Sequence, residues 1–272
     1  MKSWFMAVML TLVSSTGSAA DNSDLRSLMT IGDNRGWEAV GRLNFAGQSY
    51  CTGALIAPDL VLTAAHCLYD RVSGYRYKSN EIEFLAGWRN GRADARGQVS
   101  HVIAHPDFEF TSDDQTVRIA NDLALLKLTQ PIRAPSVKPF ETDGMPRKGA
   151  DVGVVSYGRG RADTPSIQEV CQVLARRSGT LVMSCDVEHG SSGAPVFIIG
   201  EDGVARIVSV IVAKAQVSGR EVALGTNMQK PLQDLMALVA HSEAVESEPV
   251  VTVRVLRLSD TNGNSGAKFV RP

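Results

Sequence analysis

Three short segments of the sequence carry side chains that could act together in nucleophilic catalysis. His66 follows an apolar run, Asp122 precedes a second one, and Ser192 lies in a Gly-x-Ser-Gly turn before a third. A serine hydroxyl is a poor nucleophile at neutral pH, so a base must take its proton during attack. An imidazole can act as that base, and a carboxylate can hold it in the right tautomer. Together these residue types predict a Ser-His-Asp hydrolytic site.

Each segment also has a plain structural interpretation. A histidine beside a cysteine is often a packed core residue, and both Asn121-Asp122 and the glycine- and serine-rich segment 190–193 could be ordinary turns. Their order along the chain favours catalysis, because His, Asp, Ser is one of the three chain orders known for this chemistry. His101, His105, Asp107, Asp113 and Asp114 are expected in loops or packed positions, and His189 borders the turn.

The sequence resembles the trypsin-like (chymotrypsin-fold) serine proteases from about residue 31 to residue 240. Residues 51–56 (Cys-Thr-Gly-Ala-Leu-Ile) and 61–67 (Val-Leu-Thr-Ala-Ala-His-Cys) are similar to the histidine box of that family. Residues 104–108 (Ala-His-Pro-Asp-Phe) are similar to the segment leading to its aspartate. The resemblance implies an endopeptidase whose catalytic residues are His66, Asp122 and Ser192.

The same turn is expected to bind the negative charge that develops on the substrate. Ser192, rather than Ser191, matches the nucleophile because it directly precedes Gly193. The resemblance implies an oxyanion hole made by the backbone N–H groups of Gly190 and Ser192, where glycine permits the required close approach.

The sequence departs from trypsin in the residue before the nucleophile. Trypsin-like zymogens become active when a new Ile N-terminus pairs with an aspartate there, and this chain has Ser191 instead. Residues 30–35 and 190–195 look more like the bacterial glutamyl-endopeptidase branch. We therefore expect that insertion of Ile31 beside the nucleophile is not the activating step.

The expected specificity pocket comprises Asp186, Ile211, Val212, Lys214 and Gly225. Asp186 stands six residues before Ser192, as does the acid that selects Arg or Lys in trypsin. This favours cleavage after Arg or Lys, with a small or apolar preference as the alternative. The neighbouring cysteine pattern differs from trypsin, and Lys214 could pair with Asp186 and cancel its charge. Ile211, where glutamyl endopeptidases use a histidine, argues against selectivity for Glu.

Four cysteines, an even number, indicate two disulfides in an exported chain. Sequence neighbours would pair as Cys51–Cys67 and Cys171–Cys185, and the first pair matches the family's histidine-loop disulfide. The alternative, a zinc site, lacks a C-x-x-C pair and a second histidine at ligand spacing. We expect no metal and no cofactor.

The N-terminus indicates export. Lys2, an apolar core of about ten residues and the small residues Ser18-Ala19-Ala20 fit a signal peptide over 1–20, although an uncleaved anchor is the alternative. Residues 21–30 are polar and are expected to be a loose N-terminal or pro-segment. These features predict a periplasmic or extracellular protein.

Composition and charge limit the classes of function that the protein could have. The chain has 272 residues and a formal net charge of −1, so it shows no basic footprint for nucleic acid or a membrane surface. We expect a monomer acting on protein or peptide substrates. The rival interpretation is a catalytically inactive binding protein of the same fold.

Short runs rich in Val, Ile and Leu, separated by Gly, Asp, Asn and Pro, predict an all-β protein. The resemblance implies two packed antiparallel six-stranded β-barrels, the first over about 31–130 and the second over about 140–230, joined by a proline-rich linker. Leu232, Leu235 and Val239 predict a C-terminal helix over 231–240. A C-terminal extension follows at 241–272, with one more strand over 250–258.

Overall fold

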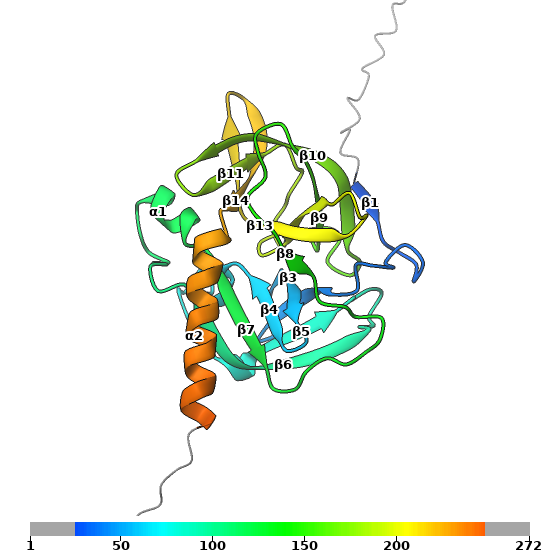
Figure 1. Ribbon diagram of the computed structural model, residues 1–272, viewed down its shortest axis with the longest axis vertical. Coiled ribbons are helices and arrows are strands. Elements are labelled where there is room, and N and C mark those ends of the chain that lie inside the picture. The colour runs from blue at the N-terminus through cyan, green and yellow to red at the C-terminus, as the bar shows by residue number, and fades with distance from the viewer. Residues whose placement is uncertain (1–24, 248–272) are drawn as a thin grey trace, which may run out of the picture.

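The computed structural model describes residues 25–247, and these form two β-barrels packed against each other, as predicted (Figure 1). The first barrel is closed in the order β2-β3-β4-β7-β6-β5. All of its pairings are antiparallel. Its strands are β2 (Val40–Phe45), β3 (Ser49–Ala57), β4 (Leu60–Thr63), β5 (Ile82–Ala86), β6 (Ala95–Ala104) and β7 (Ala124–Leu128).

The second barrel also has six antiparallel strands, because β9 pairs with both β10 and β12 and so closes the sheet. Two short strands, β1 on β10 and β8 parallel to β13, extend it. The elements are β1 (Leu25–Ser27), β8 (Glu141–Thr142), β9 (Asp151–Ser156), β10 (Ser166–Arg177), β11 (Thr180–Met183), β12 (Pro195–Ile199), β13 (Ala205–Val217) and β14 (Arg220–Thr226).

An aromatic cluster joins the two barrels. Trp37 precedes β2, Phe140 ends the proline-rich linker, and Phe197 lies on β12 of the second barrel. The ring centroids of Trp37 and Phe197 are 4.9 Å apart, and those of Phe140 and Phe197 are 4.7 Å apart. The same buried cluster continues through the first barrel and includes Val155 and Ile207 of the second. A separate cluster, which includes Leu181 and Val196, fills the rest of the second barrel.

Helices stand outside the barrels. α1 (Gln115–Ala120) is a short helix whose first turn is capped by the carboxylate of Asp114, which accepts from the N–H groups of Thr116 and Val117. α2 (Gln229–Ser247) begins earlier and ends later than the predicted 231–240. Figure 1 shows α2 running from the second barrel along the first. Leu235 is fully buried in the contact.

The N-terminal segment differs from the expected loose tail. Leu25–Ser27 pairs with β10, the N–H of Leu28 donates to the carbonyl of Pro165 (2.8 Å), and the Leu28 side chain has 0% exposure. The described part of the 21–30 segment is therefore a packed part of the second barrel. The expected signal peptide and the strand over 250–258 lie outside the described residues. Within 25–247, no helix is long and apolar enough to cross a membrane.

Both disulfides have the predicted pairing. Cys51 on β3 is bonded to Cys67, and Cys171 on β10 is bonded to Cys185. The first bond ties the segment that carries His66 to the barrel. The second ties β10 to the segment that leads toward Ser192.

Candidate active site

His66 and Asp122 meet at one edge of the first barrel. His66 lies in a short 3-10 helix, η1 (Ala65–Leu68), directly after β4, and Asp122 lies between α1 and β7. Asp122 Oδ2 is 2.7 Å from His66 Nδ1, and Asp122 Oδ1 accepts from the His66 backbone N–H at 2.8 Å. Asp122 is 4% exposed. The carboxylate therefore fixes both the ring and the backbone of the histidine.

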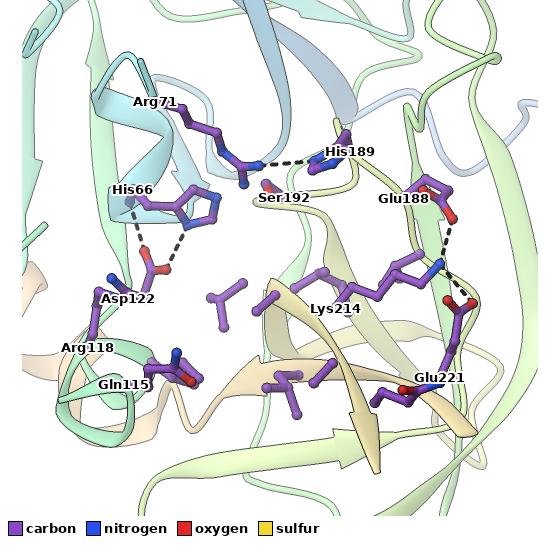
Figure 2. Close-up of a pocket in the computed structure, with 18 of the residues that line it drawn as sticks. His66, Arg71, Gln115, Arg118, Asp122, Glu188, His189, Ser192, Lys214 and Glu221 are labelled. Atoms are coloured by element: carbon purple, nitrogen blue, oxygen red, sulfur yellow. Dashed lines mark hydrogen bonds and ion pairs between the residues drawn. The ribbon is translucent and has the colours of Figure 1, made fainter. Parts of the chain in front are cut away.

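Ser192 comes from the second barrel and faces the same cleft. Together with His66 and Asp122 it lines a cleft of about 860 Å³ between the barrels (Figure 2). Among residues 25–247, no hydrogen bond joins the Ser192 hydroxyl to the His66 ring. Such contacts are often long without substrate and tighten when it binds. The three residues predicted from separate segments are thus brought to one cleft.

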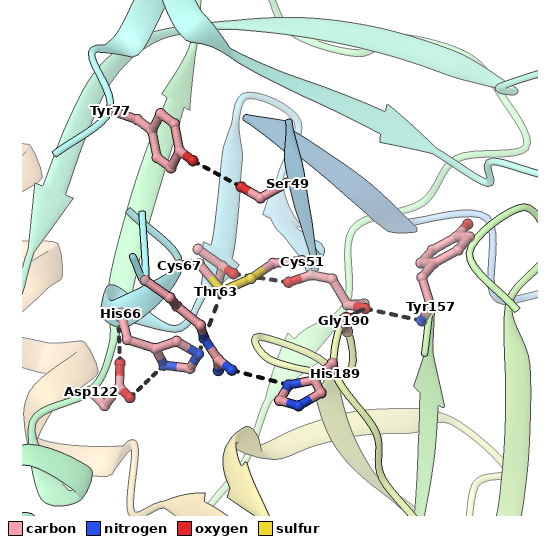
Figure 3. Close-up of a disulfide and its surroundings, with 12 residues drawn as sticks. Ser49, Cys51, Thr63, His66, Cys67, Tyr77, Asp122, Tyr157, His189 and Gly190 are labelled. Carbon is pink, nitrogen blue, oxygen red and sulfur yellow. Dashed lines mark hydrogen bonds and ion pairs between the residues drawn. A yellow bond between two sulfur atoms is a disulfide. The ribbon is translucent and has the colours of Figure 1, made fainter. Parts of the chain in front are cut away.

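The turn around Ser192 has a backbone that only glycine can adopt easily. Gly190 has φ of +92°, and a Cβ there would lie 2.3 Å from the Tyr50 ring and 2.4 Å from the carbonyl oxygen of Tyr157. The Gly190 carbonyl accepts from Thr52 Oγ1 at 2.8 Å, and Tyr157 donates its N–H to the same hydroxyl (Figure 3). The turn is therefore fixed against both β3 and the end of β9.

The backbone bonds of the turn leave two donors free. The N–H of Arg159 donates to the carbonyl of His189 at 2.6 Å, so the N–H of Gly190, in the same trans peptide, points the opposite way. The Ser192 carbonyl accepts from the Thr52 N–H at 2.8 Å. In the part of the chain that the structure describes, the N–H groups of Gly190 and Ser192 have no protein acceptor. They are available to a ligand oxygen.

The expected pocket residues divide into two groups. Ile211, Val212 and Lys214, all on β13, line the cleft, whereas Asp186 and Gly225 are not among its lining residues. Asp186 is half-buried and its N–H donates to Gln168 Oε1 at 2.8 Å. The acid expected in the pocket therefore does not line the cleft.

Lys214 does not pair with Asp186, contrary to the interaction considered from the sequence. Its Nζ lies 2.6 Å from Glu188 Oε1 and 2.9 Å from Glu221 Oε2 (Figure 2). These two carboxylates raise the pKa of Lys214, and the hydrogen bond from Lys214 lowers the pKa of Glu188. The reason for the difference is the strand pairing of β13 with β14, which puts Lys214 near Glu221.

A contact across the cleft was not predicted. Arg71, in the loop after η1, has Nη1 3.0 Å from His189 Nδ1, so a residue of the first barrel touches one beside the oxyanion turn. Burial, followed by the charges of Arg71 and Arg159, lowers the pKa of His189. His189 thus accepts from Arg71 in its neutral form. Sequence spacing carried no signal for this pair, because 118 residues separate the two.

The described residues include one group with metal-ligand atoms close together, namely Cys51, His66 and Cys67. Both of its cysteine sulfurs are used in the disulfide, and a disulfide sulfur is not the thiolate that zinc binds. The group does not suit a zinc ion.

The two-barrel fold brings His66, Asp122 and Ser192 together at one cleft. The model of the Trypsin family matches residues 32–232, which covers both barrels and all three candidate catalytic residues. The chain belongs to the Trypsin family.

Curated relatives are of the same kind. The chain is 29% identical over 172 residues to "Kallikrein 1-related peptidase-like b4" of Mus musculus, covering 61% of this chain and 62% of that protein. It is 29% identical over 119 residues to "Brachyurin" of Leptuca pugilator, covering 44% of this chain and 47% of that protein. It thus spans less than two thirds of these relatives.

A solved structure supports the fold. The "Structure of Glu endopeptidase in complex with MPD" matches with a TM-score of 0.64 and 16% identity, covering 79% of this chain and 96% of that chain. At this identity the likeness concerns the fold alone.

Proposed function

We propose that this protein is a serine endopeptidase whose catalytic residues are His66, Asp122 and Ser192. The observation that carries the proposal is the double contact of Asp122 with His66 at a cleft that Ser192 lines from the other barrel. The glycine turn with two unpaired N–H groups supports it. Family membership makes the same chemistry the first expectation for these residues.

In this mechanism, Ser192 Oγ attacks the carbonyl carbon of a peptide bond while His66 Nε2 takes its proton. Asp122 keeps the proton on Nδ1, so Nε2 is free to accept, and it stabilises the imidazolium. The N–H groups of Gly190 and Ser192 donate to the oxyanion of the tetrahedral intermediate. His66 then protonates the leaving amine, and water hydrolyses the acyl-enzyme by the same steps.

A fluorophosphonate probe tests the proposal. Purified protein should be labelled on Ser192, located by peptide mass mapping, and should cleave fluorescein-labelled casein. The Ser192→Ala variant should do neither. The alternative, an inactive binding protein, requires that native protein binds peptides but is neither labelled nor able to cleave casein.

We also propose that the protein acts outside the cytoplasm, as a monomer, on protein or peptide substrates. Two disulfides support an oxidising compartment. Cell fractionation with N-terminal sequencing tests the location and the cut after residue 20, and gel filtration tests the oligomeric state.

Cleavage after Arg or Lys stays a prediction of the sequence. Asp186, on which it rests, does not line the cleft, whereas Glu188 and Glu221 do and together outnumber Lys214 by one negative charge. A fluorogenic peptide library tests the preference. If the Asp186→Asn variant loses the preference for Arg or Lys, the preference depends on Asp186. If the Glu221→Gln variant loses it, the preference depends on the acids around Lys214.

A further inference from the structure

The residue before the candidate nucleophile is buried and polar. Ser191 has 0% exposure, and its hydroxyl donates to Ser156 Oγ at 3.1 Å and accepts from the N–H of Glu188 at 3.3 Å. Ser156, at the end of β9, is 1% exposed. The turn that ends at Ser192 is therefore held from beneath by a hydroxyl pair inside the second barrel.

Arg161 supplies the cation in this buried group. Its Nη1 donates to the Ser156 carbonyl at 3.0 Å and to Ser156 Oγ at 3.2 Å. Among the residues that the structure describes, its Nη2 is enclosed without a hydrogen-bond partner, and a Cβ on Gly158 would lie only 2.7 Å from it. The glycine thus leaves the space in which the guanidinium sits. Ser156 Oγ can accept from both Arg161 and Ser191, because a hydroxyl oxygen has two lone pairs.

The charges around Arg161 come from the same turn. Burial lowers the pKa of the guanidinium, and the carboxylates of Asp186 and Glu188 oppose that effect. Because arginine remains charged in proteins, the half-buried cation attracts both acids of the segment that leads to Ser192. Arg161 therefore acts on the turn by charge and, through Ser156, by hydrogen bonds.

In the described residues 25–247, Ile31 is not inserted beside the turn. Ile31 is 72% exposed, and the segment before it is paired along β10. We propose that Arg161 is a positioning residue that holds the turn of Ser192 in its donating conformation through Ser156, in place of an inserted N-terminus. The inference rests on the proposed endopeptidase function.

Arg161→Met tests the role, with Arg161→Lys as the conservative variant and exposed Arg177→Met as the control. A distorted turn loses oxyanion stabilisation, so kcat on the best library peptide should fall between about tenfold and about a thousandfold in Arg161→Met. KM should stay within about threefold, because ground-state binding does not use the oxyanion donors. Arg161→Lys should recover part of kcat, and Arg177→Met should match native protein.

A peptide boronate separates this role from general stabilisation. Its tetrahedral adduct places an oxygen at the oxyanion position, so its inhibition constant should weaken in Arg161→Met by about the same factor as kcat. If Arg161→Met does not fold, Ser156→Ala replaces it, with a smaller loss of the same kind expected.

The inference would be overturned if a folded Arg161→Met protein kept the kcat and the boronate affinity of native protein. It would also be overturned if the substitution changed KM alone. Unchanged kcat in Ser156→Ala would overturn it where that variant carries the test. Labelling of Ser192 by fluorophosphonate in native protein tests the proposed function independently. If the label is found, a failed Arg161 test counts against the role of Arg161 and not against the proposed function.

Discussion

Asp122 holds His66 at two points, 2.7 Å from the ring Nδ1 and 2.8 Å from the backbone nitrogen. The first contact sets the tautomer of the ring, and the second sets the position of η1. Orientation of the base is thus built into the first barrel and does not depend on substrate.

Asp122→Asn should lower kcat by about 10⁴, because an amide facing Nδ1 favours the wrong tautomer while keeping the shape of the site. Steady-state kinetics on a library peptide measures the loss. Asp107→Asn, an exposed acid in the loop before α1, is the matched control and should match native protein. Equal activity of the two variants would contradict the role of Asp122.

Ser192→Ala should lower kcat by about 10⁶, the scale seen when the nucleophile of such a site is removed. Ser191→Ala loses the hydrogen bond to Ser156 and the one from the Glu188 N–H, and should keep activity within about tenfold of native, or about 1.4 kcal/mol. The reverse order of effects would mean that the nucleophile has been assigned to the wrong serine.

Activity should fall as the solution is acidified from about pH 8 to about pH 5, because the base must be neutral to accept the serine proton. The His189→Gln variant should show the same loss of activity in acidic solution. Burial and the charges of Arg71 and Arg159 hold the pKa of His189 below its ordinary range, so His189 protonates in more acidic solution. If the pH profile of kcat/KM became flat in the His189→Gln variant, the loss of activity in acidic solution would be due to protonation of His189 instead.

Removal of either disulfide by paired Cys→Ser substitution should lower the free energy of unfolding by about 3 kcal/mol, because both bonds close loops of similar length. Urea unfolding measures it. Only the Cys51/Cys67 variant should also lose kcat at temperatures where both variants are folded, since Cys67 is next to His66 in η1. Equal loss of kcat in both would argue against this local effect.

A protein that begins at Ile31 should be less stable than one that begins at Asp21 and no more active. The shorter protein lacks β1 and Leu28, whose burial contributes about 2 kcal/mol. Thermal unfolding and kcat/KM measure both effects. Blocking the N-terminus of the Asp21 form with Gly-Ser should leave its activity within about tenfold. Activity confined to the Ile31 form would show that a free Ile terminus is required.

The sequence predicted those parts of the site that local motifs encode. His66 with Cys67, Asp122 before β7 and the Gly190–Gly193 turn are each recognisable within a few residues. Periodicity alone does not indicate β10, because Gln168, Glu169 and Gln172 interrupt its apolar pattern. Its pairing with β9 and β11 stabilises it instead.

Contacts between distant segments could not be predicted in this way. Lys214 lines the cleft, but its partners depend on how β13 pairs with β14. Likewise, Ser191 lies 35 residues from Ser156, and nothing in its neighbouring residues indicates that the two hydroxyls meet. Propensity and periodicity describe one element at a time, whereas these contacts depend on tertiary packing.

The aromatic contact of Trp37, Phe140 and Phe197 has a consequence for how the protein loses activity. The proposed base His66 and the proposed nucleophile Ser192 belong to opposite barrels. Phe197 lies on the strand that directly follows the Ser192 turn. A small rotation of one barrel on the other would separate them while every strand stayed paired. Proteolytic activity should therefore depend on how the two barrels are aligned. On heating, activity should be lost at a lower temperature than the spectroscopic signal of the β-sheet.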